Sequence, residues 1–340
     1  MPREMTVLVL GAGSSAKFGL PLGSKLKSDL SRALKIEFQD RYNQSSGSHE
    51  ILNALKTHVR KSGSTDVNPF RHAAIQISSA MPLAESIDEY IERHRADEKK
   101  VLCAKLGISH CILKSEVKSK LKTKFEDHSS VDLSGSWLAK FMNLITKGKS
   151  KEELKASFNN LVVINFNYDR CFEQFSYIWL QKMYELSAQE SAALCIKMKI
   201  FHPYGRLGSL PFEGLPDPVP YGAELQAIDL LKAASRIRTY AEANDEAEEV
   251  VWLEPALMSA RRFIFLGFAF HEPNLQICSP KTPGNRVVRC YASVGDEISA
   301  PRAEAIGERI RSLISIESSF SMSRGDCEKF WDEFDNVPLS

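Results

Sequence analysis

The sequence predicts an α/β fold built on a doubly wound parallel sheet. Three observations lead to this fold class: short apolar runs typical of buried strands recur along the chain, segments with helical periodicity separate them, and the first run breaks directly into glycine. Strands that alternate with helices pair in parallel, because each crossover helix returns the chain to the same end of the sheet. The predicted strands are residues 5–10, 161–164, 199–201, 262–266 and 286–291.

The chain between the first and second predicted strands is expected to be helical. Apolar residues recur at every fourth position through much of it, and Ser86 with Glu89 has the spacing of a helix capping box. We find no convincing strand between about residues 40 and 158 and therefore predict a large helical insertion between the first and second strands. The predicted organisation is a sheet domain of residues 1–39 and 159–340 with a helical subdomain of residues 40–158.

Composition excludes several classes of protein. The 44 basic and 43 acidic residues nearly cancel, so no overall field favours direct binding to nucleic acid or to an acidic membrane. We expect no signal peptide and no membrane span, because no apolar run of sufficient length occurs. The seven cysteines are scattered without any Cys-x-x-Cys pair, which favours the reducing cytoplasm and predicts no bound metal.

The first predicted strand ends in a glycine turn that could bind a nucleotide. Gly11, Ala12, Gly13 and Ser14 follow the strand and open a helix. Gly11 allows a sharp turn, and the missing side chain of Gly13 would let a pyrophosphate approach the backbone N–H groups. Simple close packing of the strand against the helix is the alternative explanation for these small residues.

Polar residues or glycines also follow the other strands, at the sheet edge where ligands of such folds bind. They are Asn165, Asn167 and Asp169 after the second strand, His202 after the third, and Gly267 and Phe268 after the fourth. Each has a structural alternative. Asp169 can cap a helix, the two asparagines can form turns, His202 can be a buried core histidine and Gly267 can allow close packing.

A dehydrogenase is the first function to weigh, because Gly11 to Ala16 fits Gly-x-Gly-x-x-Ala. Such an enzyme needs a second strand that ends in an acidic residue about twenty positions later. Glu37 and Asp40 have no predicted strand to occupy, and the next strand begins near residue 161. This gap argues against hydride transfer.

The ordered motifs GAGSS, NFNYD, HPYG and LGFAF resemble the sirtuin-like Rossmann fold, and the string GAGSSAKFGLPLGSKL is closer to its bacterial antiphage branch than to the protein deacylases. The resemblance covers the predicted strands but not the helical insertion. It implies a dinucleotide loop, a nicotinamide-ribose motif, a catalytic histidine and a turn near the adenosine. The dinucleotide loop corresponds to Gly11 to Ser14, and the nicotinamide-ribose motif to Asn167 with Asp169. The catalytic histidine corresponds to His202, and the turn near the adenosine to Gly267 with Phe268.

One departure from the deacylases changes the expected reaction. Sirtuin deacylases carry a zinc module with paired Cys-x-x-Cys motifs, and this sequence has none. Without the groove that this module forms, water is favoured as the acceptor. The resemblance then implies an NAD⁺ glycohydrolase that releases nicotinamide and ADP-ribose, with Asn167 holding the ribose and a water and His202 acting as base. The alternatives are an NAD-dependent protein deacylase and a module that binds NAD⁺ or ADP-ribose without cleaving it.

The same resemblance implies a cellular role. In the antiphage branch this domain depletes NAD⁺ in the cytoplasm as an abortive-infection effector, and such activity must be restrained. We therefore expect a homo-oligomer, with the helical insertion as its platform, and a possible partner such as a HerA-type translocase ATPase or a short Argonaute. NAD⁺ is expected as substrate, with no metal.

Overall fold

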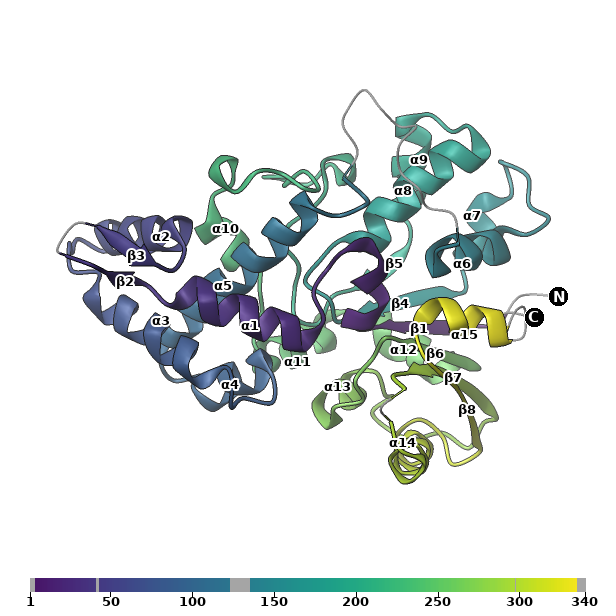
Figure 1. Ribbon diagram of the computed structural model, residues 1–340. Coiled ribbons are helices and arrows are strands. Elements are labelled where there is room, and N and C mark those ends of the chain that lie inside the picture. Colours follow the sequence, from purple (N-terminus) through teal and green to yellow (C-terminus); the bar gives the residue numbers. More distant parts are fainter. Residues whose placement is uncertain (1–3, 41–42, 123–134, 297, 335–340) are drawn as a thin grey trace.

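A six-stranded parallel sheet forms the centre of the computed structural model, which describes residues 4–40, 43–122, 135–296 and 298–334 (Figure 1). Across the sheet the strands lie in the order β5-β4-β1-β6-β7-β8. Counted along the chain this is 3-2-1-4-5-6, the order of doubly wound dinucleotide-binding sheets. The strands are β1 (Thr6–Leu10), β4 (Leu161–Asn165), β5 (Lys199–Phe201), β6 (Arg262–Leu266), β7 (Val288–Val294) and β8 (Ser318–Arg324).

The predicted parallel α/β sheet is confirmed, with one strand more than expected. The first four predicted strands lie where the apolar runs are, and β7 is displaced by two to three residues from its predicted bounds. The additional strand, β8, has the sequence SSFSMSR and lies at the edge of the sheet. Only two of the seven β8 residues are buried, so this strand lacks the apolar run by which the others are recognised.

Helices cover both faces of the sheet (Figure 1). On one face α6 (Trp137–Thr146), α8 (Cys171–Tyr184) and α15 (Cys327–Phe334) pack together, and α14 (Ala300–Leu313) covers β8 from the other. The remaining elements after β4 are α9 (Ala188–Cys195), α10 (Leu230–Ala234), α11 (Tyr240–Glu249), α12 (Leu253–Ser259), α13 (Glu272–Ile277) and the 3₁₀ turns η2 (Pro211–Glu213) and η3 (Leu225–Ala227).

Most of the chain between β1 and β4 lies beside the sheet as a group of helices (Figure 1). There α1 and α3 pack on α5, joined by α10 from later in the chain, whereas α6 packs on α8 at the sheet. The limits of a separate helical subdomain stay a prediction. The elements are η1 (Ala12–Phe18), α1 (Gly23–Leu34), β2 (Glu37–Phe38), β3 (Gln44–Ser46), α2 (His49–Lys61), α3 (Asn68–Ala80), α4 (Ile87–Arg93), α5 (Glu98–Val117) and α7 (Leu154–Ser157).

The expectation of no strand between residues 40 and 158 is wrong in one detail, because β3 lies there. It pairs antiparallel with β2 in a separate two-stranded sheet. Glu37 therefore lies in a strand, but not beside β1, whose neighbours are β4 and β6. The acidic strand that a dehydrogenase places next to the glycine turn is still missing from that position.

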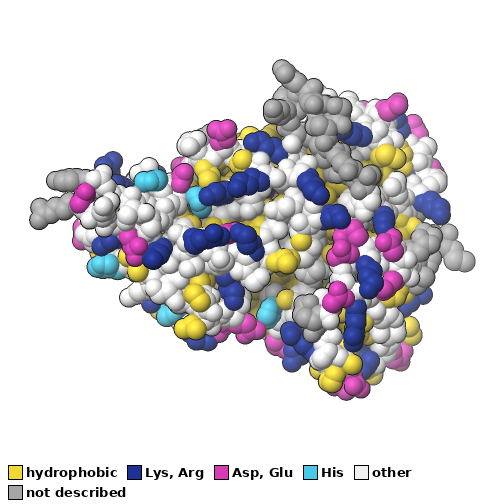
Figure 2. All heavy atoms as spheres, in the orientation of Figure 1, with side chains coloured by type: hydrophobic (Ala, Val, Ile, Leu, Met, Phe, Trp, Pro, Cys, Tyr) yellow, Lys and Arg dark blue, Asp and Glu magenta, His cyan; other side chains and the backbone are white. Residues whose placement is uncertain are grey.

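Charged side chains of both signs are spread over the face drawn in Figure 2, with basic ones gathered over its middle. None of the described helices is long and apolar enough to cross a bilayer.

The turns after β1 and β6 pack backbone against backbone through three glycines. The Gly11 N–H donates to the carbonyl of Leu266 at 3.0 Å, and the Gly13 N–H donates to that of Gly267 at 3.1 Å. A Cβ on Gly13 would lie 2.6 Å from the Gly267 Cα, and one on Gly267 would lie 2.2 Å from the Ser14 nitrogen. Close packing thus explains these glycines, and the N–H of Gly13, expected to meet a pyrophosphate, is already bonded within the protein.

Replacing Gly267 by alanine should destabilise the fold more than its backbone angle alone requires. Gly267 has a φ of +58°, and its new Cβ would overlap the backbone of the other turn, which cannot move aside cheaply. Gly63 is the matched control, because its φ is +78° and nothing lies within 4 Å of its Cβ position. In urea unfolding, Gly63→Ala should cost about 1–2 kcal/mol and Gly267→Ala about 1–3 kcal/mol more. Equal losses would contradict the packing explanation.

Candidate functional site

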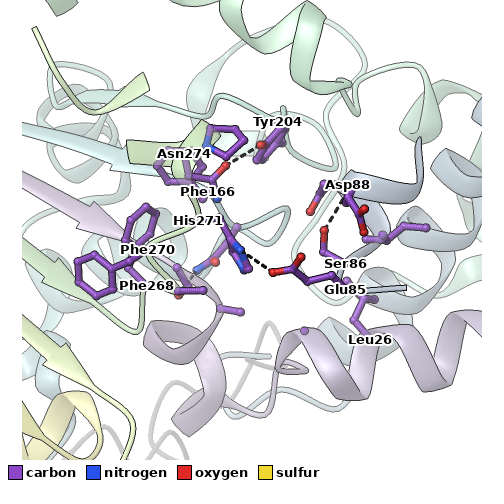
Figure 3. Close-up of a pocket in the computed structure, with 18 of the residues that line it drawn as sticks. Leu26, Glu85, Ser86, Asp88, Phe166, Tyr204, Phe268, Phe270, His271 and Asn274 are labelled. Carbon is purple, nitrogen blue, oxygen red and sulfur yellow. Dashed lines mark hydrogen bonds and ion pairs between the residues drawn. The ribbon is translucent and has the colours of Figure 1, made fainter. Parts of the chain in front are cut away.

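A cavity of about 1140 Å³ opens at the carboxyl ends of β1, β4 and β6 (Figure 3). Ligand sites in proteins commonly enclose about 300–1,000 Å³, so this cavity is large enough for a dinucleotide. It lies where the strand order reverses, which is where doubly wound sheets bind ligands. On the sheet side it is lined by Gly11 and Ala12, residues 166–169 and residues 267–270, and on the other side by residues of α1, α4, α13 and α14.

The predicted dinucleotide loop is divided between the cavity wall and the interior. Gly11 and Ala12 line the cavity, whereas Gly13 and Ser14 are not among its lining residues. Ser14 is 2% exposed. Its hydroxyl donates to the Gly11 carbonyl at 2.8 Å, and its own carbonyl accepts from the Trp137 indole at 2.7 Å. Ser14 therefore holds the shape of the turn.

Asn167 lies on the cavity wall with its amide group oriented by the glycine turn. Its Nδ2 lies 3.1 Å from the Gly11 carbonyl oxygen and 3.1 Å from the hydroxyls of Ser14 and Ser15. With the NH₂ group committed to these acceptors, Oδ1 is the amide atom left to accept a hydrogen bond from a ligand. Asn165, whose role the sequence left open, accepts from the Asn167 backbone N–H at 3.1 Å and so helps to position it.

Asp169 lines the cavity and lies one residue before Arg170, which occupies the N-cap position of α8 that the sequence offered for Asp169. Its Oδ1 accepts from the Ser15 hydroxyl at 3.0 Å and from the backbone N–H of Cys171, the first residue of α8, at 2.9 Å. Burial raises the pKa of this carboxyl to about 6, and the nearby Glu116 adds to the rise, although the hydrogen bonds from Cys171 and Ser15 oppose it. The contact with α8 and a role in ligand binding are therefore compatible, since both of these hydrogen bonds go to Oδ1.

His202 does not line the cavity. It lies behind Asn167, with its Nδ1 3.1 Å from the Asn167 carbonyl oxygen and its Nε2 2.7 Å from Oε1 of Glu173. Arg206 also contacts Glu173, at 3.1 Å. Both ring nitrogens of His202 are thus bonded within the protein, and it reaches the cavity only through the backbone of Asn167. Its catalytic role stays a prediction, and the contact that the structure gives it is one of positioning.

Glu173 is the charge partner of His202 in this buried network. Burial by itself raises the pKa of a carboxyl, but here the positive charge and hydrogen bond of His202 and the charge of Arg206 outweigh that effect and hold the pKa at about 2. The exposed fractions of the two paired side chains, 7% for His202 and 5% for Glu173, explain why the pairing is strong.

The predicted adenosine-side residues form an aromatic part of the wall. Gly267 and Phe268 line the cavity, and Phe268 packs against Phe166 with ring centroids 5.2 Å apart. Phe270 packs on Phe268 at the same centroid distance. Figure 3 shows these rings together on one side of the cavity. Such a surface suits the planar base of a nucleotide.

The sequence did not indicate that the residues just before and within α4 form part of the cavity wall. Asp88 accepts a hydrogen bond from the Tyr168 hydroxyl, and burial raises the pKa of its carboxyl. Glu85 faces His271, whose Nδ1 lies 3.3 Å from its Oε1 (Figure 3). In the sequence this segment carried only the signature of a helix cap, and Ser86 does cap α4. Nothing local indicates that it folds against residues 80 positions later.

No family model matches this chain, and no curated protein matches it. The sirtuin-like resemblance therefore depends on the motifs themselves. Among the described residues, no three His, Cys, Asp or Glu side chains cluster in a way that could hold a metal ion.

The Glu173–His202 pair should give a measurable pH dependence of stability. The pKa of Glu173 is lower in the folded chain, about 2, than its ordinary value of 4.5, so its contribution is complete above pH 4.5 and is lost as pH falls toward 2. This difference corresponds to about 3 kcal/mol. Glu173→Gln should therefore destabilise the chain at pH 7 but approach wild-type stability toward pH 3, measured by urea unfolding. A destabilisation that does not change with pH would contradict the assignment.

Proposed function

We propose that this chain is an NAD⁺ glycohydrolase, which cleaves NAD⁺ to nicotinamide and ADP-ribose. The observation that carries the proposal is the position of Asn167 and Asp169 together on the wall of a dinucleotide-sized cavity at the switch point of the sheet. The glycine turn and the aromatic wall of Phe166 and Phe268 border the same cavity. The ordered motifs that resemble the sirtuin-like fold support it independently.

For this reaction the protein must orient the ribose and the attacking water, and it must accept a proton from that water. Breaking the N-glycosidic bond builds positive charge on the ribose, and nicotinamide leaves as a neutral molecule, so no strong general acid is required. The Oδ1 of Asn167 would accept a hydrogen bond from a ribose hydroxyl or from the attacking water. The water must lose a proton, and Asp169, with a pKa of about 6, is ionised at neutral pH and suited to take it.

The bonded ring of His202 favours a second candidate function. If a free histidine base is required, this arrangement would bind NAD⁺ or ADP-ribose without cleaving it. Incubating the purified chain with NAD⁺, alone and together with the product of a neighbouring gene, separates the two candidates. Release of nicotinamide and ADP-ribose is expected, whereas tight binding with intact NAD⁺ recovered in both samples would contradict hydrolysis and favour the binding module.

The cellular role follows from the resemblance alone. We propose that the activity depletes NAD⁺ during antiphage defence in the cytoplasm, in a homo-oligomer or together with a HerA-type ATPase or a short Argonaute. The incubation with the neighbouring gene product also tests whether a partner is needed.

Asn167→Ala should lower the rate of NAD⁺ hydrolysis by about a hundredfold, because the ribose and water lose the group that orients them. Asn53→Ala is the control, since Asn53 is exposed on α2 outside the cavity. Initial rates of nicotinamide release and a thermal unfolding curve should be measured for both. A normal rate in a folded Asn167→Ala protein would contradict the proposal.

The pH profile should distinguish the base from the positioning residue. If Asp169 accepts the proton, the rate falls as pH drops through about 6, where its carboxyl becomes protonated, and Asp169→Asn removes this acidic limb along with most of the activity. His202→Gln should instead lower kcat while keeping the limb. Loss of the limb in His202→Gln with its retention in Asp169→Asn would reverse the two roles.

A further inference from the structure

We infer that the outer edge of β8 is an interface at which two copies of this chain pair, β8 against β8, antiparallel about a twofold axis. The pairing would join the two six-stranded sheets into one continuous sheet. This surface belongs to the sheet and not to the helices between β1 and β4, where the resemblance led us to expect the contact. The inference does not depend on the proposed reaction.

The two edges of the sheet differ in how well they are protected. At one edge β5 has only three residues and begins with Lys199. Short strands and lysine side chains both prevent an edge from pairing with another chain. At the other edge β8 has seven residues, no proline, and no charge before its last residue, Arg324. It pairs with β7 over its whole length without a bulge. The β8 edge therefore has none of the features that block pairing along its first six residues.

The backbone of β8 is open on its outer side. Figure 1 shows the strand at the margin of the sheet, and α14 and α15 both pack on it. Within the described part of the chain, only β7 forms hydrogen bonds with the backbone of residues 319–323. Alternate residues of an edge strand direct their N–H and C=O groups outward, and a strand from a second chain satisfies these groups.

The side chains of β8 complement a second copy of the same strand. A seven-residue strand overlaps fully with an antiparallel copy only when its middle residue, Ser321, lies on the twofold axis. Phe320 then lies opposite Met322 of the second copy, and both are partly exposed in the single chain. Aromatic rings and methionine sulfurs form favourable contacts, and a cross-strand pair brings them within reach.

The charges at the ends of β8 favour the antiparallel orientation. Glu317 directly precedes the strand and Arg324 ends it; both are exposed, and neither forms an ion pair among the described residues. Antiparallel pairing brings Arg324 of one copy near Glu317 of the other, whereas parallel pairing would bring like charges together. Asp326, just beyond the strand, accepts from the Lys329 N–H at 2.9 Å, so its carboxylate faces α15.

A disulfide test uses two exposed serines of β8 as matched positions. Opposite residues have Cβ atoms about 5 Å apart, so Ser321→Cys should form a disulfide with its own copy. The two copies of residue 319 would lie about 14 Å apart, so Ser319→Cys should not cross-link. The seven natural cysteines are buried and do not compete. Under mild oxidation, the fraction of covalent dimer is measured on a denaturing gel. Equal cross-linking of the two variants, or none in either, would overturn the inference.

The second test follows the charges by sedimentation equilibrium. One strand pair is a small interface, so the wild type should dimerise with a dissociation constant on the order of 10 µM. Arg324→Glu should weaken the dimer about tenfold, and adding Glu317→Arg should restore it. Arg60→Glu, at an exposed position on α2, is the control and should change nothing.

Two results of the sedimentation experiment would contradict the inference. One is a wild type that stays monomeric at about 100 µM, ten times the expected dissociation constant. The other is an oligomer that Arg324→Glu leaves unchanged, which would place the contact elsewhere, for example on the helices between β1 and β4. Thermal unfolding curves verify that each variant is folded. Neither test involves NAD⁺, so a failure of the proposed reaction is distinguishable from a failure of this inference.

Discussion

The backbone contact between the turns after β1 and β6 is the constraint on which the site depends. Gly11, Gly13 and Gly267 approach so closely that a single added methyl group would overlap main-chain atoms. Because each turn bonds the other through backbone groups, the ends of β1 and β6 are held in one register. The Gly11 carbonyl then becomes a fixed acceptor, and the amide of Asn167 takes its orientation from it. The glycines thus contribute to the cavity mainly by shaping its wall.

A chain of hydrogen bonds carries this constraint into the interior. The Asn167 side chain bonds the glycine turn, its carbonyl bonds His202, and His202 pairs with Glu173. Each group forms a hydrogen bond with the next, in a site where water is largely excluded. None of these side chains can therefore rotate without leaving a buried polar atom without a hydrogen-bond partner. Precise placement of Asn167 is what hydrolysis of a bound dinucleotide would require, and this network supplies it whether or not His202 also moves a proton.

The helices between β1 and β4 complete the cavity rather than standing apart from it. Residues before and within α4 form the wall opposite the sheet, and Tyr168 and His271 reach across to Asp88 and Glu85. A sheet edge alone would leave one side of a ligand in water. By closing that side, α4 adds charge to a site whose sheet wall is largely apolar and aromatic, and the electrostatic preference for a ligand then depends on both walls together.

The sequence by itself determined the elements that local chemistry specifies. Apolar runs marked β1, β4 and β6, because a strand buried on both faces must be apolar throughout, and a shorter run marked β5 at the edge of the sheet. Residues at the strand ends pointed to Asn167 and Asp169 on the cavity wall. Tertiary structure alone decided the rest. The edge strand β8 has no apolar run, His202 lies behind the wall because Glu173 holds its ring, and Asp88 reaches the site only through long-range packing. Burial, ion pairing and the opposite wall of a cavity join residues far apart in the chain, and no local pattern records which of them meet.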